Sequence, residues 1–118
     1  MKFGQLVYEL RIRQRLTLRE FCRMTELDPG YWSRIERGLH HPPKSKQVLN
    51  NIAKALKLKE NSEDWHTLFE LATISFIPAE LLANPSIVDM LPALFRTVRG
   101  DRPDKQDLER LIEMLREA

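Results

Sequence analysis

The sequence contains one cysteine, four glycines and no long apolar run among its 118 residues. A single cysteine cannot form an internal disulfide, which fits a reducing compartment. A membrane span needs about 20 consecutive apolar residues, and no stretch of the sequence approaches this length. Met1-Lys-Phe-Gly leads into a charged helix rather than a signal peptide. We therefore expect a soluble, cytoplasmic protein that does not contact a membrane.

The residue patterns of metal sites and enzymes are also lacking. Cys22, His40, His41 and His66 do not have the paired spacing that is typical of metal ligands. The sequence contains no glycine-rich loop of the kind that binds phosphate groups. Acidic residues between 101 and 109 are typical of a helix start with a solvated face. We predict no enzymatic activity, no metal and no cofactor.

Charge is distributed unevenly along the chain, although the net charge is only +2. Residues 1–60 have 13 basic and 6 acidic side chains, a balance of +7, whereas residues 61–118 have 6 and 11, a balance of −5. The first half is therefore suited to contact a polyanion. Phosphates would repel the second half, which is more suited to contact a protein.

Apolar residues recur at helical spacing, and no segment shows sustained strand alternation, so we predict an all-α fold. Five helices are expected within residues 1–75, and the first should span residues 3–15. Each of the four later helices should begin after a residue that is suited to cap a helix N-terminus. These predicted caps are Thr17, Asp28, Ser45 and Ser62.

Two helices joined by a tight turn are predicted between Leu18 and Gly38. The first should pack through Phe21 and Met24, with Thr17 as its cap and Glu20 completing a capping box. Its small Cys22 falls where two helix axes would cross closely.

The second of these helices should begin at the cap Asp28, with Pro29 at its first position, and stop at Gly38. Two apolar side chains three residues apart should face inward, Trp32 and Ile35. The outer face keeps groups that can hydrogen-bond bases and phosphates, namely Gly30, Tyr31, Ser33, Arg34 and Arg37. A protein presents a short helix to the major groove of DNA in this way.

The segment Asp28-Pro-Gly-Tyr-Trp-Ser-Arg-Ile-Glu-Arg-Gly38, followed by Pro43 and an apolar helix over 48–56, resembles the XRE family of helix-turn-helix regulators, which includes phage Cro proteins and repressors. The resemblance extends over residues 3–74, and its most specific part is Ser33 to Gly38. It implies a compact, five-helix, lambda-repressor-like domain that binds double-stranded operator DNA, usually as a symmetric dimer. It implies nothing about residues 76–118.

Arg34 is the strongest candidate to read a base, because its fork matches the two acceptors of guanine and such a pair discriminates by about 1 to 3 kcal/mol. The alternatives for Arg34 are a phosphate contact and a solvated side chain. Tyr31 and Ser33 are more suited to phosphate than to base, and Gly30 lets the backbone approach the DNA closely. The full set of predicted DNA-binding residues is Thr17, Arg19, Pro29, Gly30, Tyr31, Ser33, Arg34, Arg37, Lys44 and Lys46.

Four of these residues lie away from the predicted recognition helix. Thr17 and Arg19 are at the start of a helix, where the backbone N–H groups attract a phosphate, although Thr17 can also serve only as a cap. Lys44 and Lys46 should flank the groove as phosphate contacts.

Glu36 and Glu26 need separate explanations. A carboxylate on a DNA-facing helix is unfavourable unless it is neutralised, and the resemblance implies that Glu36 pairs with Arg11; a solvated Glu36 is the alternative. Such a pair fixes the placement of two helices more than it adds stability.

Glu26 stands in the turn where the family usually has glycine, and a left-handed backbone there would cost a non-glycine residue about 1 to 2 kcal/mol.

A domain boundary is predicted near Phe76, where the helical pattern breaks before Pro78. Residues 76–118 should form an amphipathic helical hairpin, its first main helix capped by Asn84. Its apolar stripes comprise Ile87, Leu91, Leu94, Phe95, Val98, Leu108, Leu111, Ile112 and Leu115. A hairpin of this size hides little surface alone, so these residues should form a dimer interface, pack on the first domain or bind another protein.

Together, these features predict a sequence-specific DNA-binding transcriptional regulator, most often a repressor in the resembled family, that binds a palindromic operator as a homodimer. The alternative is the antitoxin of a toxin–antitoxin pair. In that case residues 76–118 would bind the toxin as a protein partner, and DNA binding would serve autoregulation.

Overall fold

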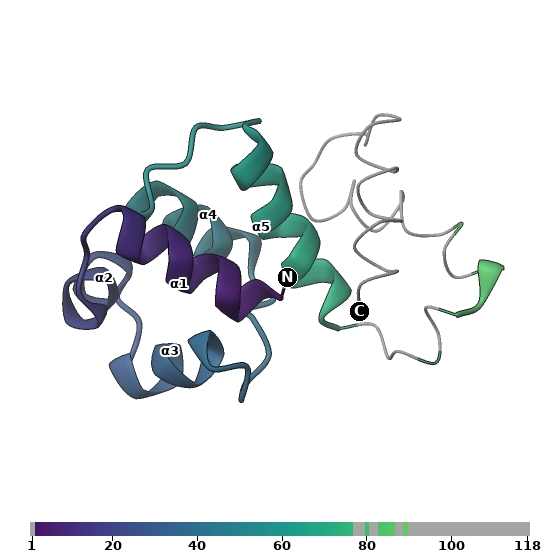
Figure 1. The fold of residues 1–118 in the computed structure, drawn as a ribbon, viewed down its shortest axis with the longest axis horizontal. Helices are drawn as coiled ribbons and strands as arrows, with labels where there is room; N and C mark the ends of the chain where they lie inside the picture. The colour runs from purple at the N-terminus through teal and green to yellow at the C-terminus, as the bar shows by residue number, and fades with distance from the viewer. Residues whose placement is uncertain (1, 77–79, 81–82, 87–88, 90–118) are drawn as a thin grey trace.

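The computed structural model describes residues 2–76, 80, 83–86 and 89, and the prediction of an all-α fold is confirmed (Figure 1). Residues 2–76 form five helices and contain no strand. The helices are α1 (Phe3–Arg13), α2 (Leu18–Thr25), α3 (Pro29–Glu36), α4 (Lys46–Ala55) and α5 (Glu63–Ile74).

The predicted N-terminal caps are present at the start of four helices. Each cap side chain accepts the backbone N–H of the residue three positions later, at 2.9 to 3.3 Å. The capping residues are Thr17 for α2, Asp28 for α3, Ser45 for α4 and Ser62 for α5. The side chain of Glu20 accepts in return from the Thr17 N–H, which completes the capping box. These local signals place the helix starts where the sequence predicts them.

The first four helices end in the same way, through a residue with a left-handed backbone. These residues are Arg15, Glu26, Gly38 and Lys57, with φ of 56°, 59°, 75° and 57°. The residue after each of them is a leucine, whose N–H donates to the carbonyl five positions earlier. This is the Schellman closure of a helix C-terminus. It ends α1 at Arg13, two residues before the predicted end, and it ends α3 at Glu36.

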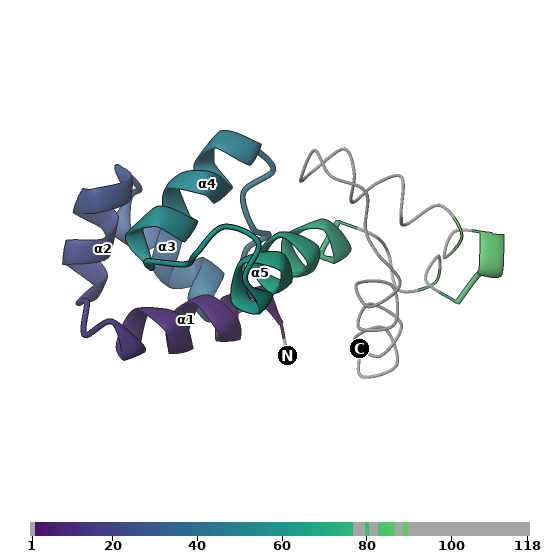
Figure 2. The same ribbon diagram turned by 90° about the horizontal axis from the view of Figure 1, so that it is seen from above.

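Three aromatic rings join the first three helices. Trp32 of α3 stacks at a tilt on Phe21 of α2, with ring centroids 4.7 Å apart, and meets Phe3 of α1 edge to face at 6.4 Å. All three side chains are almost fully buried. As Figures 1 and 2 show, α3 packs beside both α1 and α2, so the core holds α3 from one side along its length.

Helices α4 and α5 complete the domain. Helix α4 packs against α2 and α5, and α5 also packs against α1. Trp65 and Phe69 of α5 are buried with ring centroids 4.7 Å apart, and Leu68 between them is fully buried. One apolar core therefore links all five helices.

The prediction for Met24 is wrong. Its side chain is 53 % exposed, and the inward position near the end of α2 belongs to Thr25. The Thr25 hydroxyl donates to the Phe21 carbonyl at 2.8 Å, so a polar side chain enters the core with its donor satisfied. The 3.6-residue period of a helix allows either position, and the packing of α2 against its neighbours selects Thr25.

The predicted hairpin falls largely outside the described residues. Asn84 Oδ1 accepts the Ser86 N–H at 2.9 Å, which is the capping contact expected at that position. All nine residues of the predicted apolar stripes, from Ile87 to Leu115, lie beyond the part of the chain that the structure describes.

Candidate nucleic-acid interface

Helix α3 has one buried side and one open side. Trp32 and Ile35 are 0 % and 1 % exposed, as predicted, and fix the helix to the core. The side chains predicted to face DNA lie on the remaining surface, where Tyr31 and Ser33 are half-buried. Pro29, Gly30, Arg34 and Arg37 are exposed. The buried side of this eight-residue helix is thus packed on the core, and its open side offers hydrogen-bonding groups.

The C-terminal end of α3 is tied to α1 by a bidentate ion pair. Arg11 Nε donates to Glu36 Oε2 at 2.7 Å, and Arg11 Nη2 donates to Glu36 Oε1 at 2.9 Å. The two side chains are only 9 % and 7 % exposed. Their hydrogen bonding raises the pKa of Arg11 above its usual value. This is the contact that the resemblance implied, and it neutralises the carboxylate of Glu36.

Two further hydrogen bonds complete this ion pair. Trp32 Nε1 donates to Glu36 Oε2 at 2.7 Å, and Arg11 Nη1 donates to the Leu16 carbonyl at 2.9 Å. The Trp32 bond was not predicted, because a tryptophan in an apolar pattern shows its ring but not the partner of its N–H. Buried charges need such partners to offset their desolvation. The pair therefore connects α1, the loop that follows it and α3.

A close backbone approach holds the same end of α3. Gly4 of α1 lies so near that a β-carbon there would be 2.9 Å from the Glu36 carbonyl oxygen and closer still to that of Ile35. Any side chain at this position would collide with backbone atoms, which cannot rotate away. The inclination of α3 relative to α1 therefore depends on a glycine as well as on the ion pair.

Tyr31 is supported from the loop after α3. The His40 ring meets the Tyr31 ring edge to face, with centroids 4.9 Å apart. Burial raises the pKa of Tyr31, which keeps the phenol protonated at neutral pH. A protonated phenol is a hydrogen-bond donor, which suits a phosphate oxygen.

The remaining predicted DNA-binding residues lie on three different elements. Arg19 is exposed in the first turn of α2, and Lys46 is exposed at the start of α4. The hydroxyl oxygen of Thr17 accepts the Glu20 N–H at 3.1 Å, so its capping role is present in this structure. Arg37 is not extended freely, because its Nε donates to the Ser33 carbonyl at 3.3 Å.

Lys44 takes part in a contact that the sequence did not predict. Its Nζ lies 5.2 Å from the centroid of the Phe76 ring, and the His41 ring lies 5.6 Å from the same ring. A cation over an aromatic face is attracted by the ring's quadrupole. The loop between α3 and α4 therefore packs against Phe76, two residues after the end of α5. Nothing local in the sequence links Lys44 to Phe76, which is 32 positions later.

Other chemistry has little support in the described residues. None of their helices combines the length and apolarity needed to cross a membrane. Within the same part of the chain, no three His, Cys, Asp or Glu side chains gather as metal ligands. Cys22 is buried, and this burial raises the pKa of its thiol, which disfavours the reactive thiolate.

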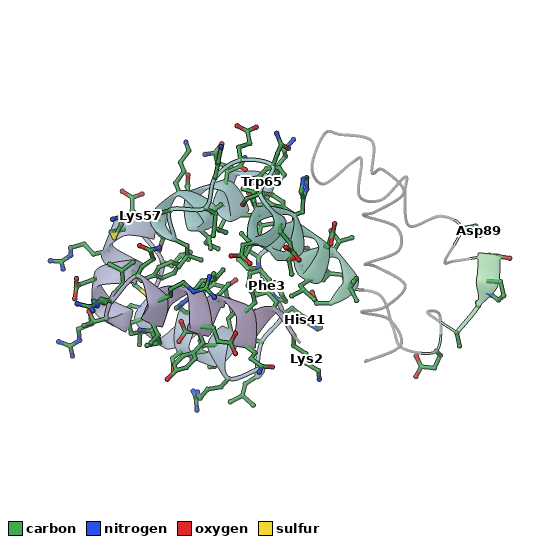
Figure 3. The ribbon with its side chains drawn as sticks, turned by 45° about the horizontal axis from the view of Figure 1, so that its top comes forward. Lys2, Phe3, His41, Lys57, Trp65 and Asp89 are labelled. Atoms are coloured by element: carbon green, nitrogen blue, oxygen red, sulfur yellow. The ribbon has the colours of Figure 1, made fainter. Side chains whose placement is uncertain are left out.

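Basic side chains project from the surface of the five-helix domain, such as the labelled Lys57 in Figure 3.

Comparison with known proteins gives one match. A family model described as a helix-turn-helix domain matches residues 2–65, which is more than half of the 118 residues. No curated protein and no solved structure matches the chain. The matched region contains α1 to α4 and the start of α5.

Proposed function

The chain belongs to the helix-turn-helix domain family, and we propose that it is a sequence-specific transcriptional regulator that places α3 in the major groove of DNA. The observation that supports this role best is the two-sided character of α3. Its inner side is fixed by Trp32 and Ile35, and its outer side offers Tyr31, Ser33 and Arg34. A groove-reading helix needs both properties, because only a fixed helix can align side chains with base edges.

The predicted residues divide into two roles in this proposal. Arg34 reads a base, because its planar fork can donate two hydrogen bonds to guanine. Tyr31, Ser33 and Arg37 contact phosphates from α3, while the backbone at Pro29 and Gly30 approaches the DNA closely. Phosphate contacts from the other elements come from Thr17, Arg19, Lys44 and Lys46. Contacts of the second kind position the domain and supply affinity without reading sequence.

We further propose that the protein binds a palindromic operator as a homodimer and represses by occupying a promoter. The domain of residues 1–75 would contact DNA, and residues 76–118 would form the dimer interface through the predicted apolar stripes. One α3 buries little surface, and a second copy doubles the contacts without requiring tighter binding by each. The acidic balance of residues 61–118 supports a protein contact there rather than a DNA contact.

The acidic balance of residues 61–118 is also compatible with the antitoxin alternative. An antitoxin would use residues 76–118 to bind a toxin, and its DNA binding would regulate its own synthesis. A toxin gene adjacent to the gene for this chain would favour this alternative over an isolated regulator.

Selection of bound DNA from a random duplex pool tests the proposal with the full chain. We expect an enriched motif of two inverted half-sites, with centres about 10 base pairs or one helical turn apart, or a multiple of this. Arg34→Ala should relax the preference at one base pair of each half-site. Lys44→Ala is the matched control, since loss of a phosphate contact should weaken binding to all sequences about equally.

Salt dependence and stoichiometry complete this test. The affinity should fall steeply between about 50 and 200 mM salt, because each neutralised phosphate releases counterions. Two chains should occupy each operator in analytical ultracentrifugation. Salt-independent binding would contradict DNA recognition as a whole, and one chain per enriched site would contradict the dimer. If Arg34→Ala and Lys44→Ala both weaken all sequences equally, Arg34 contacts phosphate and another group reads the base.

A further inference from the structure

The open side of α3 lacks a side chain at Gly30, and two opposite charges border the empty position. A β-carbon at Gly30 would lie 3.1 Å from Asp28 Oδ2 and 3.7 Å from Arg34 Nη1. Gly30 lies within the regular helix Pro29–Glu36, so its backbone does not require glycine. Glycine inside a helix costs about 1 kcal/mol relative to alanine. The space above Gly30 is therefore maintained at an energetic cost.

Arg34 lies at the edge of this space. Long side chains on a helix lean toward its N-terminus, over the residue one turn earlier. Here that earlier residue is Gly30, and Arg34 Nη1 lies beside the first turn of α3. This turn is the part of a recognition helix that contacts base edges.

Asp28 places a carboxylate oxygen beside the same space. Its Oδ2 accepts the Tyr31 N–H at 2.9 Å, and this capping bond fixes the position of the carboxylate. A fixed negative charge attracts the guanidinium toward the N-terminal end of α3. A carboxylate at a DNA-facing surface is otherwise unfavourable, because it repels phosphates.

We propose that Gly30 and Asp28 are specificity-determining positioning residues that act through Arg34. Gly30 leaves room for the Asp28 carboxylate near Arg34 Nη1, and Asp28 orients the guanidinium by its charge. A side chain that is already oriented loses less entropy when it forms two hydrogen bonds to one guanine. This inference rests on the proposed function, since it concerns how the base-reading arginine of that function is directed.

Two substitutions test this role in the full chain, with DNA affinity measured for the selected operator and for operators altered one base pair at a time. Asp28→Asn keeps a good N-cap, so the melting temperature should change little. It also removes a negative charge near phosphates, so affinity for unrelated DNA should rise. Discrimination at the base pair read by Arg34 should nevertheless fall by about fivefold. This is part of the discrimination that a bidentate contact with a base usually provides.

Gly30→Ala is the second substitution, and it should separate folding from recognition. Alanine favours the helix interior, so the protein should remain folded. The new methyl carbon would lie 3.1 Å from Asp28 Oδ2, so the carboxylate must shift, whereas its 3.7 Å separation from Arg34 Nη1 is an ordinary contact. Discrimination should therefore fall at the same base pair as in Asp28→Asn, while the other base pairs keep their preferences.

A double substitution shows whether the effect passes through Arg34. In the Arg34→Ala background, Asp28→Asn should cause no further loss of discrimination. A further loss in that background would overturn the inference, because Asp28 would then contact the DNA itself. Unchanged discrimination in both single variants would overturn it too, while leaving the proposed function intact. If the unaltered chain binds no DNA selectively, the proposed function fails, and the inference fails with it.

Discussion

The two ends of α3 differ in how firmly the rest of the protein holds them. At the C-terminal end, Gly4 touches the last carbonyls, and Glu36 is paired with Arg11 and hydrogen-bonded to Trp32. At the N-terminal end, Pro29 and Gly30 are exposed, and the first turn is held by the cap bond from Asp28 and by the edge of the His40 ring on Tyr31.

This difference separates orientation from recognition. The end that sets the direction of α3 is held by buried contacts. The end that would meet base edges is shaped by small and exposed residues. Substitutions at the first end should therefore alter stability, and substitutions at the second should alter sequence preference.

Removal of one partner of the buried ion pair should cause the largest loss of stability. Arg11→Ala or Glu36→Ala should each lower the free energy of unfolding by about 3 to 5 kcal/mol, because each leaves a buried charge without its partner. The double variant should lose less than the sum of the two. Urea denaturation of all four proteins measures this coupling, and strictly additive losses would show that the pair does not act as a unit.

Gly4→Ala should have the next largest effect. Its new β-carbon would collide with the carbonyl oxygens of Ile35 and Glu36, so α1 and α3 would have to separate. Overpacking of this kind costs about 1 to 3 kcal/mol. Gly38→Ala is the matched control, because a β-carbon there has no atom within 4 Å.

The control would therefore show only the strain of an alanine at φ 75°. The difference between the two variants lies in the contact with α3. If Gly4→Ala unfolds at the same urea concentration as the unaltered chain, the close approach of α1 does not orient α3.

The sequence predicts local features of this protein well and distant contacts poorly. The caps Thr17 and Asp28 depend on atoms within three residues, so their spacing alone identifies them. Arg11 and Glu36 are 25 positions apart, and only the family resemblance linked them. The contact of Lys44 with Phe76 follows from no local pattern and from no feature that the family resemblance implies. It is visible only in the folded structure.

Backbone conformation at helix ends was only partly predictable. Glycine marks the left-handed residue after α3, but Arg15 and Lys57 adopt the same conformation without any such sign. The leucine that follows each of these residues is the more regular feature, since three of the four pack against the core. Burial of that leucine can offset the strain of the residue before it. The preference of glycine for a left-handed backbone does not predict this effect.

Phe76→Ala should weaken DNA binding without touching either end of α3. The cation over the ring would lose an attraction of about 0.5 to 1 kcal/mol, and Lys44 would then be less ordered. Affinity for all DNA sequences should fall by about twofold to fivefold. Phe76→Tyr is the control, because it keeps the aromatic face. A change in base preference, rather than in general affinity, would show that this loop also orients α3.

The smallest expected effect is a gain of stability at the turn that leads into α3. Glu26 has φ 59° and ψ 33°, a left-handed conformation that costs a non-glycine residue about 1 to 2 kcal/mol. Glycine removes this strain, but it also loses more conformational entropy on folding, by about 0.5 to 1 kcal/mol. Glu26→Gly should therefore raise the free energy of unfolding by about 0.5 kcal/mol.

Lys57→Gly provides the comparison for this last substitution, because Lys57 has φ 57° after α4, away from the turn into α3. Both variants should unfold at a slightly higher urea concentration with an unchanged slope, since each changes the same backbone strain. Only Glu26→Gly changes the turn that precedes the open end of α3. An altered base preference in that variant alone would show that the turn helps to direct α3 into the groove. Equal preferences in both would leave that task to the buried contacts at Gly4 and Arg11.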